Sequence, residues 1–136
     1  MTGRTAGNAF VEKYRSAGVI SGEHFVGDVA GATALIIDDL ISSGHTLLRA
    51  ARAARQAGAR RVLALVAHGL FMPGSAEVLA DDAIDRLVVT DTVSRFRLPP
   101  GGAALAKIDT LPAAPLLAET IRRLHENQPL TDLLVF

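Results

Sequence analysis

Hydrophobic and polar positions along the chain predict strands that alternate with helices. Four short runs have the length and composition of strands: residues 32–37 and 61–67, which are mainly apolar, and residues 86–90 and 106–111, which include polar residues. Helix signals appear in three further segments: residues 47–58, 75–79 and 115–125. Strands without polar alternation, separated by helices, indicate a parallel sheet that is covered on both faces. The pattern therefore predicts an α/β fold.

Glycine and proline positions support these boundaries. Gly58 stands where the helix that begins at residue 47 should stop, because glycine readily adopts the left-handed conformation that ends helices. Pro115 suits the first turn of the last helix. Residues 94–104 are predicted to form a loop. The region around Lys13 and Arg15 is weakly patterned, and on pattern alone both residues are ordinary surface charges.

Composition and charge narrow the range of functions. The 136 residues suffice for a core and fit a single domain, residues 1–136. A formal net charge of zero argues against electrostatic binding to nucleic acid or to an anionic membrane. The absence of cysteine excludes disulfides, thiolate catalysis and cysteine-bound metals, and it suits a cytoplasmic protein. No apolar run approaches the roughly 20 residues that span a bilayer, and the N-terminus lacks the apolar core of a signal peptide.

Polar residues collect where the predicted strands end. The first strand runs into Asp38 and Asp39, and the others end near further polar or small residues: His68 and Gly69, Thr90 to Thr92, and Thr110. Open parallel sheets bind ligands at the carboxyl ends of their strands, so these residues should share one edge of the sheet. Taken singly, His68 is better interpreted as a hydrogen-bonded structural histidine, and Asp91 as the cap of a turn.

The segment LIIDDLISSGHT, residues 35–46, carries the strongest local signal. After Asp39 the chain must turn and start a helix near Thr46, which leaves the backbone amides of residues 44–46 free to bind an anion. Hydroxyl groups at positions 42, 43 and 46 add donors, so phosphate is the natural ligand. Asp38 and Asp39 could then bind sugar hydroxyls, directly or through hydrated Mg²⁺. The same residues also fit a solvated strand end followed by a helix cap.

LIIDDLISSGHT resembles the phosphoribosyl-diphosphate binding loop of the phosphoribosyltransferase superfamily: an apolar strand, two acids, three residues and a Ser-Gly-x-Thr turn. Further blocks occur in the order found in ribose-phosphate diphosphokinases, the synthetases of phosphoribosyl diphosphate: VEKYR (11–15), VGDVAG (26–31), AGARRV (57–62), AHGLF (67–71), RLVVTDTV (86–93) and APLLAETIRRLHE (114–126). The final LLVF is also similar to that family's C-terminus. The resemblance covers nearly the whole chain, and the blocks together are much more specific than the loop alone.

The resemblance implies a three-layer parallel sheet of the phosphoribosyltransferase type, truncated at the N-terminus, and transfer of diphosphate from ATP to ribose 5-phosphate. In the family the first acid binds the ribose hydroxyls and the acid pair helps to hold Mg²⁺; these positions are Asp38 and Asp39. A lysine and an arginine of a mobile loop stabilise the transferred diphosphoryl group, and they match Lys13 and Arg15. The loop that holds the 5-phosphate corresponds to five residues: Ser42, Ser43, Gly44, His45 and Thr46.

The chain departs from the family pattern in three places. Ser42 and Ser43 stand where many members have Asp and Thr, and both hydroxyls can still bind phosphate. His45 replaces a glycine or another small residue, which matters if that position needs a positive φ. The chain also starts too late to include the family's first domain, on which the adenine site shared between subunits draws, or its pyrophosphate-binding loop. We therefore expect a fragment, a truncated gene product or a stand-alone relic that forms a homo-oligomer, and whether it is an active enzyme is left open.

Other functions share part of the pattern. A phosphoribosyltransferase has the same loop but should carry a nucleobase-binding hood or C-terminal pocket, and the C-terminal blocks fit the synthetase better. A receiver domain also ends a strand with two acids, but it needs a phospho-acceptor Asp near residue 68 and a later lysine, and neither is placed correctly. A non-catalytic module that binds phosphoribosyl groups or aids assembly stays open. The partners that the resemblance implies are ribose 5-phosphate, ATP and phosphoribosyl diphosphate.

Overall fold

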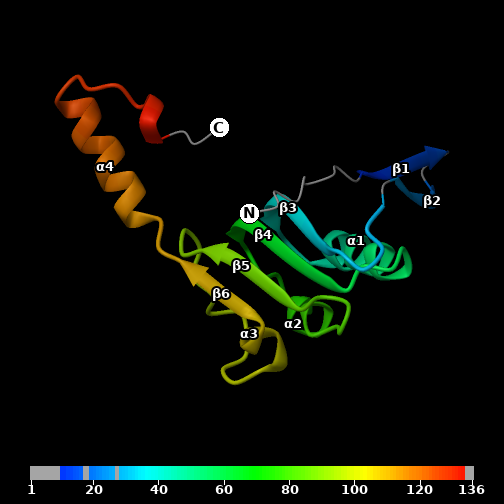
Figure 1. Cartoon of the computed structure of the whole chain (residues 1–136). Coiled ribbons are helices and arrows are strands. Elements are labelled where there is room, and N and C mark those ends of the chain that lie inside the picture. Colours follow the sequence, from blue (N-terminus) through cyan, green and yellow to red (C-terminus); the bar gives the residue numbers. More distant parts are fainter. Residues whose placement is uncertain (1–9, 17–18, 27, 134–136) are drawn as a thin grey trace.

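The computed structural model describes residues 10–16, 19–26 and 28–133 of the 136-residue chain (Figure 1). Its elements follow in chain order: β1 (Phe10–Ser16), β2 (Val19–Val26), β3 (Thr33–Ile41), α1 (His45–Gln56), β4 (Arg61–Gly69), α2 (Ser75–Leu79), β5 (Arg86–Thr90), α3 (Ala103–Ala106), β6 (Ile108–Leu111), α4 (Ala114–His125) and the 3₁₀ helix η1 (Thr131–Leu133). β1 and β2 form an antiparallel hairpin, while β3, β4, β5 and β6 form a separate parallel sheet in that order. The predicted α/β fold with a parallel sheet is confirmed.

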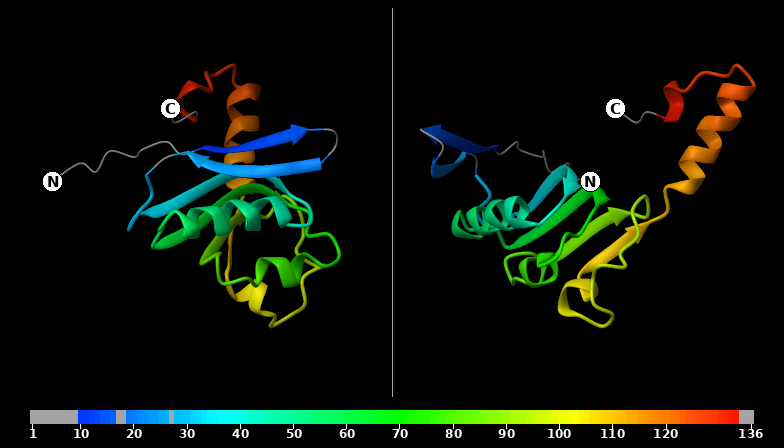
Figure 2. Two further views of the ribbon diagram at one scale, coloured as in Figure 1. Left: turned by 90° about the vertical axis from the view of Figure 1, so that its right-hand side faces the viewer. Right: turned by 180° about the vertical axis from the view of Figure 1, so that it is seen from behind.

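Helices α1, α2 and α3 connect the four parallel strands, and all three pack on the same face of the sheet (Figures 1 and 2). Side chains of a strand alternate between the two faces of its sheet. In β4, Val62, Ala64 and Val66 are buried on the side of the helices. From the helices, Leu47 of α1 and Leu79 of α2 are buried in the same core. The core therefore lies between the sheet and α1 to α3.

The opposite face of the sheet carries no helix within the described residues. Leu35 and Ile37 of β3 and Leu65 of β4 are exposed there, because they occupy the alternate positions of their strands. The apolar strands predict that helices cover both faces of the sheet. In the described part of the chain, helices cover only one face. An apolar strand alone does not reveal which of its faces has a packing partner.

Several element boundaries differ from the sequence prediction. β3 extends to Ile41 and β4 to Gly69, and these two residues pair. Asp38 and Asp39 therefore lie inside β3 rather than after it, because backbone pairing with β4 continues past them. Helix α3 forms at the end of a segment with the pattern of a loop, and the β1–β2 hairpin forms where the pattern is weak. The helix at residues 75–79 is confirmed.

Two ion pairs fasten α1 to the segment between α2 and β5. Arg52 lies 2.6 Å from Asp81, and Arg55 lies 2.7 Å from Asp85. The Val62 N–H also donates to Asp85, at 2.6 Å. Burial alone would raise the pKa of Asp85, but the hydrogen bonds from Val62 and Arg55 outweigh burial and lower it. This side of α1 is therefore tied to the sheet by charged groups as well as by its apolar core.

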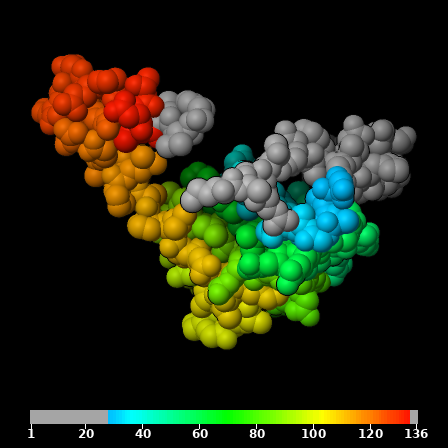
Figure 3. All heavy atoms as spheres, viewed as in Figure 1, coloured from blue at the N-terminus to red at the C-terminus, as the bar shows by residue number. Residues whose placement is uncertain are grey.

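Helix α4 leaves the sheet at the end of β6 and stands apart from it (Figures 1 and 3). None of its residues is buried, and its charged side chains bond to one another. Glu119 accepts hydrogen bonds from Arg122 and Arg123, which lower the pKa of Glu119 to about 2. Arg123 also reaches Asp132 of η1, at 3.0 Å. Over the described ranges, no helix combines the length and the apolar character needed to cross a bilayer.

Candidate functional site

The turn between β3 and α1 brings residues 42–46 together. Gly44 has a φ of 84°, in the left-handed region, and His45 is the first residue of α1. Glycine adopts this conformation without a steric penalty, so the chain can turn sharply into the helix. Because the positive φ falls on Gly44, His45 needs no unusual backbone conformation, and its side chain is compatible with the turn.

The start of α1 presents backbone N–H groups as donors. The first N–H groups of a helix have no partner within it, and in the described part of the chain no side chain caps this end of α1. Leu48 N donates to Gly44 O at 2.9 Å and begins the helical series. The amides before Leu48 are therefore available, and the helix dipole favours an anion beside them. The exposed residues Ser42 and Thr46 place hydroxyl groups in the same turn.

Two contacts arrange the side chains of this turn. His45 Nδ1 and Ser43 Oγ form a hydrogen bond of 3.0 Å. One helical turn further on, Arg49 Nη2 donates to Thr46 Oγ1 at 3.5 Å. Arg49 thereby brings a positive charge to the turn, and this charge adds to the attraction for an anion. Arg49 stands three residues after Thr46, and this helical spacing is the sequence signal for the contact.

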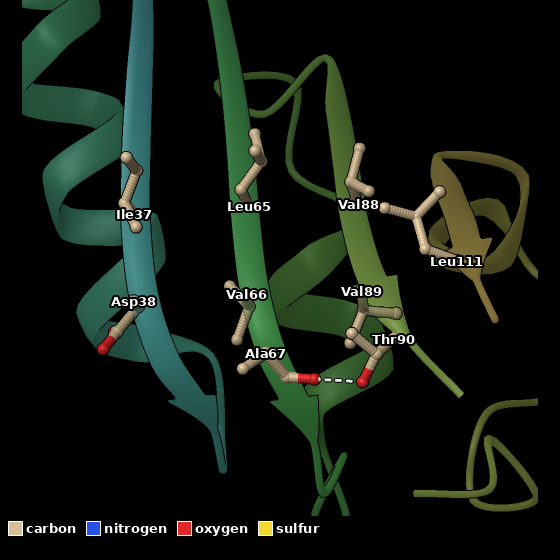
Figure 4. Close-up of a pocket in the computed structure, with 9 residues that line it drawn as sticks. All are labelled: Ile37, Asp38, Leu65, Val66, Ala67, Val88, Val89, Thr90 and Leu111. Atoms are coloured by element: carbon tan, nitrogen blue, oxygen red, sulfur yellow. Dashed lines mark hydrogen bonds between the residues drawn. The ribbon is translucent and has the colours of Figure 1, made fainter. Parts of the chain in front are cut away.

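The two acids of β3 lie on opposite faces of the sheet, because neighbouring residues of a strand alternate. Asp38 is half-buried on the side of the helices, and its Oδ1 accepts the Asp39 N–H at 2.9 Å. Figure 4 shows the Asp38 carboxylate turned away from β4. Asp39 is exposed on the other face. The carboxylates therefore do not stand side by side, and their joint role stays a prediction.

The chemistry of these acids nevertheless suits Mg²⁺. The ion prefers oxygen ligands, keeps several waters, and is usually held by one or two carboxylates together with substrate phosphates. Among the described residues, no three His, Asp or Glu side chains gather into a cage for a metal. An accessible carboxylate at the end of β3, close in sequence to the turn at residues 42–46, fits the kind of site in which a substrate supplies further ligands.

The segment after β4 is hydrogen-bonded to the beginning of the turn. Leu70 N donates to Ile41 O at 2.9 Å, and Met72 N donates to Ser42 O at 3.0 Å. Between them, Phe71 is fully buried and has a φ of 47°. A bulky residue at positive φ is strained, and such strain persists only where the surroundings fix the chain. Residues 70–72 are therefore a rigid support for the beginning of the turn.

The ends of β4 and β5 meet in a cluster of hydroxyl and imidazole groups. His68 Nδ1 lies 2.7 Å from Thr92 Oγ1, which lies 2.8 Å from Thr90 Oγ1. Thr90 also donates to the carbonyl oxygen of Ala67 (Figure 4). His68 is hydrogen-bonded, as the sequence predicts, and it is exposed. Since His68 pairs in register with Leu40 of β3, this cluster lies at the same end of the sheet as the turn.

Lys13 and Arg15 lie on β1, in the hairpin that is separate from the parallel sheet. Lys13 pairs with Glu23 and Arg15 with Ile20, and the register is irregular between the two pairs. The hairpin runs next to α1 (Figure 2). The side chains of Lys13 and Arg15 lie outside what the structure describes, as do residues 134–136 of the LLVF block. The catalytic role of Lys13 and Arg15 therefore stays a prediction.

Arg97 is a further cation near this end of the sheet, and sequence reasoning does not single it out. Its Nη1 donates to Leu70 O at 2.9 Å, and its guanidinium lies 4.6 Å from the centre of the Phe96 ring. Because Leu70 bonds to Ile41, this contact connects the loop before α3 to the segment that supports the turn at residues 42–46. Nothing in the local sequence pattern of residues 94–104 indicates the contact.

Comparisons with known proteins identify relatives of nearly the whole chain. A family model described as the phosphoribosyl synthetase-associated domain matches residues 19–135. The ribose-phosphate pyrophosphokinase of Pasteurella multocida is 40% identical over 124 residues, which cover 90% of this chain and 38% of that protein. A putative ribose-phosphate pyrophosphokinase 2 of Streptococcus pyogenes is 39% identical over 111 residues, covering 81% of this chain and 32% of that protein. The chain thus spans less than two fifths of the length of these relatives.

A solved structure gives the same result for the fold. The crystal structure of phosphoribosylpyrophosphate synthetase from Mycobacterium smegmatis matches with a TM-score of 0.72 and 32% sequence identity, over 88% of this chain and 37% of that one. The chain therefore resembles this synthetase in its three-dimensional fold as well as in its sequence. Since the family model covers most of the chain, the chain belongs to the phosphoribosyl synthetase-associated domain family.

Proposed function

We propose that the chain binds ribose 5-phosphate and takes part in the transfer of diphosphate from ATP to this sugar phosphate, the reaction of a ribose-phosphate diphosphokinase. The observation that carries the proposal is the turn at residues 42–46, where free amides and hydroxyl groups meet Arg49 at the start of α1. Relatives named ribose-phosphate pyrophosphokinase support the same reaction. Because the chain spans 38% of the first of them, the whole reaction is a proposal for this chain.

The turn is suited to the 5-phosphate. The amides that follow Gly44 can donate to phosphate oxygens, and the exposed hydroxyls of Ser42 and Thr46 are further donors in the same turn. Arg49 compensates part of the negative charge of the ligand. A charged acceptor strengthens each of these hydrogen bonds relative to a neutral one. The His45–Ser43 hydrogen bond holds the imidazole near the turn, where a protonated ring would add attraction.

The acids of β3 are suited to the sugar and to the metal. In this proposal Asp38 accepts hydrogen bonds from ribose hydroxyls, and Asp39 helps to hold Mg²⁺ together with water and substrate oxygens. When bound, Mg²⁺ would neutralise negative charge on the diphosphate. The placement of the acids in the same strand that leads into the turn supports this division of roles, because sugar and phosphate are parts of one ligand.

The proposed transfer makes one bond to phosphorus and breaks another. The 1-hydroxyl oxygen of ribose 5-phosphate attacks the β-phosphorus of ATP, and the bond from that phosphorus to the oxygen shared with the α-phosphate breaks. The products are phosphoribosyl diphosphate and AMP, and the hydroxyl proton passes to solvent. Negative charge grows on the phosphoryl oxygens during transfer, so Lys13 and Arg15 are proposed to stabilise it.

The cysteine-free sequence suits the cytoplasm, where we expect the chain to act.

A second function is binding without turnover. The match covers 38% of the first relative, and it includes the turn at residues 42–46 on which the proposed phosphate site rests. Such a chain could bind phosphoribosyl compounds or serve in assembly without completing the transfer. Binding and turnover must therefore be measured separately.

Titration calorimetry of the 136-residue chain with ribose 5-phosphate, with and without Mg²⁺, tests the binding step. Free ribose is the matched control, because it keeps the sugar and lacks the phosphate. We expect heat of binding for ribose 5-phosphate and none for ribose. Chromatography of a mixture with ATP, Mg²⁺ and ribose 5-phosphate then tests the transfer. Equal binding of both sugars would refute the phosphate site, whereas binding without phosphoribosyl diphosphate would favour the second function.

A further inference from the structure

Three side chains at the ends of β4 and β5 form a series of short contacts, here called the hydroxyl ladder. It runs from Ala67 O to Thr90 Oγ1, then to Thr92 Oγ1 and finally to His68 Nδ1. The last two contacts are 2.8 Å and 2.7 Å long. Backbone pairing of β4 with β5 ends at Val66, whereas β4 continues to pair with β3. The hydroxyl ladder therefore replaces the backbone bonds between β4 and β5 at this end of the sheet.

The number of protons in the hydroxyl ladder determines the state of the imidazole. Each of the three short contacts needs one proton between its two heavy atoms, because two lone pairs that face each other repel. The carbonyl of Ala67 has no proton to give, and the two threonine hydroxyls supply one each. The third proton must therefore come from Nδ1 of His68. Thr90 donates to Ala67 O, Thr92 donates to Thr90, and the Nδ1–H group donates to Thr92.

The other ring nitrogen of His68 is left as an acceptor. A neutral imidazole carries one N–H group, so a proton on Nδ1 leaves a lone pair on Nε2. Within the described residues Nε2 makes no hydrogen bond, and the side chain of His68 is exposed. The bond at Nδ1 fixes both the tautomer and the orientation of the ring. Nε2 is thus held ready to accept a hydrogen bond from a ligand.

His68 lies beside the turn at residues 42–46 and on the same face of the sheet as Asp38. It pairs in register with Leu40, which stands between Asp38 and Ser42 in β3 and the turn. Neighbouring strands are about 4.8 Å apart, and alternate residues of a strand share a face. Figure 4 shows the Asp38 carboxylate turned away from β4, which leaves the β4 side of a bound ligand to another group. His68 is in the position to be that group.

We propose that Nε2 of His68 accepts a hydrogen bond from the 1-hydroxyl of bound ribose 5-phosphate, and that Thr90 and Thr92 position the ring for this contact. The inference rests on the proposed function, because it adds a contact to the same ligand. The neighbouring 2- and 3-hydroxyls suit the two oxygens of one carboxylate, that of Asp38, so the 1-hydroxyl remains for a group on the next strand. Its oxygen is the attacking atom of the proposed transfer, and a fixed acceptor orients it.

Titration calorimetry with two ligands tests the contact. The 1-deoxy analogue of ribose 5-phosphate keeps the ring and the phosphate and lacks only the 1-hydroxyl. We expect the wild-type chain to bind the analogue about fivefold more weakly than ribose 5-phosphate, which is the effect of one hydrogen bond. In His68→Asn the two ligands should bind equally, because the shorter amide reaches the place of Nδ1 and not that of Nε2. An undiminished preference for ribose 5-phosphate in His68→Asn would overturn the proposal.

Two matched variants and a control ligand sharpen this comparison. His68→Gln should keep part of the preference, because its longer side chain carries an amide oxygen to the place of Nε2. His125→Asn makes the same exchange at an exposed position of α4 and should keep all of it. The penalty for 2-deoxyribose 5-phosphate should be the same in the wild type and in His68→Asn. If His68→Asn instead removes that penalty, His68 contacts the 2-hydroxyl and the assignment is wrong.

Nitrogen NMR of the ligand-free chain tests the hydroxyl ladder on its own. In protein labelled with ¹⁵N-histidine, the signals of His68 are those that disappear in His68→Asn. At about pH 8, which favours a neutral ring, we expect a proton on Nδ1 and none on Nε2. Thr92→Val keeps the shape of the side chain, removes the hydroxyl and should abolish this preference. A proton on Nε2 in the wild-type chain would overturn the inference.

The outcomes separate the role of His68 from the proposed function. Binding of ribose 5-phosphate with no preference over the 1-deoxy analogue would refute the contact and leave the proposed function standing, and this result needs no variant to fold. No binding of ribose 5-phosphate by the wild-type chain would refute the proposed function, and the contact with it. Circular dichroism of each variant checks that the fold is retained.

Discussion

Gly69 and Phe71 fit together only because residue 69 has no side chain. A Cβ atom at Gly69 would lie 2.4 Å from the Phe71 ring, far inside van der Waals contact. Phe71 is fully buried at a positive φ, so it has little freedom to move away. Its neighbours bond to Ile41 and Ser42. The packing of these two residues therefore helps to hold the beginning of the turn at residues 42–46 in place.

We predict that Gly69→Ala weakens both the fold and the binding of ribose 5-phosphate. The added methyl group forces Phe71 to move, which typically costs about 1–3 kcal/mol of unfolding free energy. Urea unfolding and calorimetric titration measure the two effects. Gly101→Ala is the control away from the turn: a Cβ there meets nothing within 4 Å, so its positive φ of 72° costs stability without moving Phe71, and sugar phosphate affinity should stay unchanged. Unchanged sugar phosphate affinity in Gly69→Ala would contradict the role of this support.

Thr46→Val tests the proposed phosphate site in the turn at residues 42–46. Valine keeps the shape of threonine and removes the hydroxyl that we expect to donate to the phosphate. Loss of a hydrogen bond to a charged group should weaken ribose 5-phosphate binding by roughly 1–3 kcal/mol in titration calorimetry. Thr120→Val in α4 is the matched control, since its hydroxyl bonds to Leu116 O, away from the turn. Equal affinity of wild type and Thr46→Val would remove the central claim of the site.

From the position of His45 in the turn we predict that the binding of ribose 5-phosphate depends on pH. A protonated imidazole beside the phosphate attracts it, so ribose 5-phosphate should bind more tightly at about pH 6 than at about pH 8. The phosphate itself takes up a proton with a pKa of about 6, which acts in the opposite direction. The comparison with His45→Gly isolates the contribution of the ring, and His125→Gly in α4 controls for a general effect. Identical pH profiles for wild type and His45→Gly would show that the imidazole does not contact the ligand.

Sequence reasoning predicts the parallel sheet and the position of the turn, because both depend on local patterns. The stop at Gly58 is confirmed by its φ of 90° and by the end of α1 at Gln56. The extent of β3 past Asp39 depends on its pairing with β4, which no local pattern contains. For the same reason, alternation within an extended strand separates Asp38 from Asp39, whereas adjacency in sequence suggests that they act as a pair.

The contacts of cations are the least predictable part of the site. Arg97 and Leu70 meet although they are far apart in sequence, and the loop between β5 and α3 brings them together. Helix α4, whose large apolar side chains are exposed, is a different case. Its apolar spacing predicts a helix correctly, but the same spacing is found in buried helices. A periodic pattern therefore identifies an element and one packing side, and only the folded chain shows whether a partner occupies that side.

The ion pair of Arg55 and Asp85 predicts how stability depends on pH. The lowered pKa of Asp85 means that its stabilisation is present above the ordinary Asp value of 3.8 and is lost as the pH falls through the value in the folded state. Asp85→Ala should reduce the unfolding free energy at neutral pH by roughly 1–3 kcal/mol, and the difference from wild type should shrink below about pH 4. Asp109→Ala is the control, because its pair with Arg86 is exposed and spans 3.6 Å. A constant difference across this pH range would contradict the assignment.

The last prediction separates binding from turnover. The chain matches 38% of a relative named ribose-phosphate pyrophosphokinase, over 124 residues, and phosphoryl transfer depends on holding both substrates in position. We expect these residues on their own to bind ribose 5-phosphate and to form phosphoribosyl diphosphate weakly or not at all. Any residual turnover should fall in Lys13→Ala and Arg15→Ala, while sugar phosphate affinity stays unchanged, because both residues are proposed to act on the diphosphate. Chromatographic detection of product and calorimetry measure the two quantities on the same samples. Robust turnover that Lys13→Ala abolishes would show that these 136 residues already contain a complete active site.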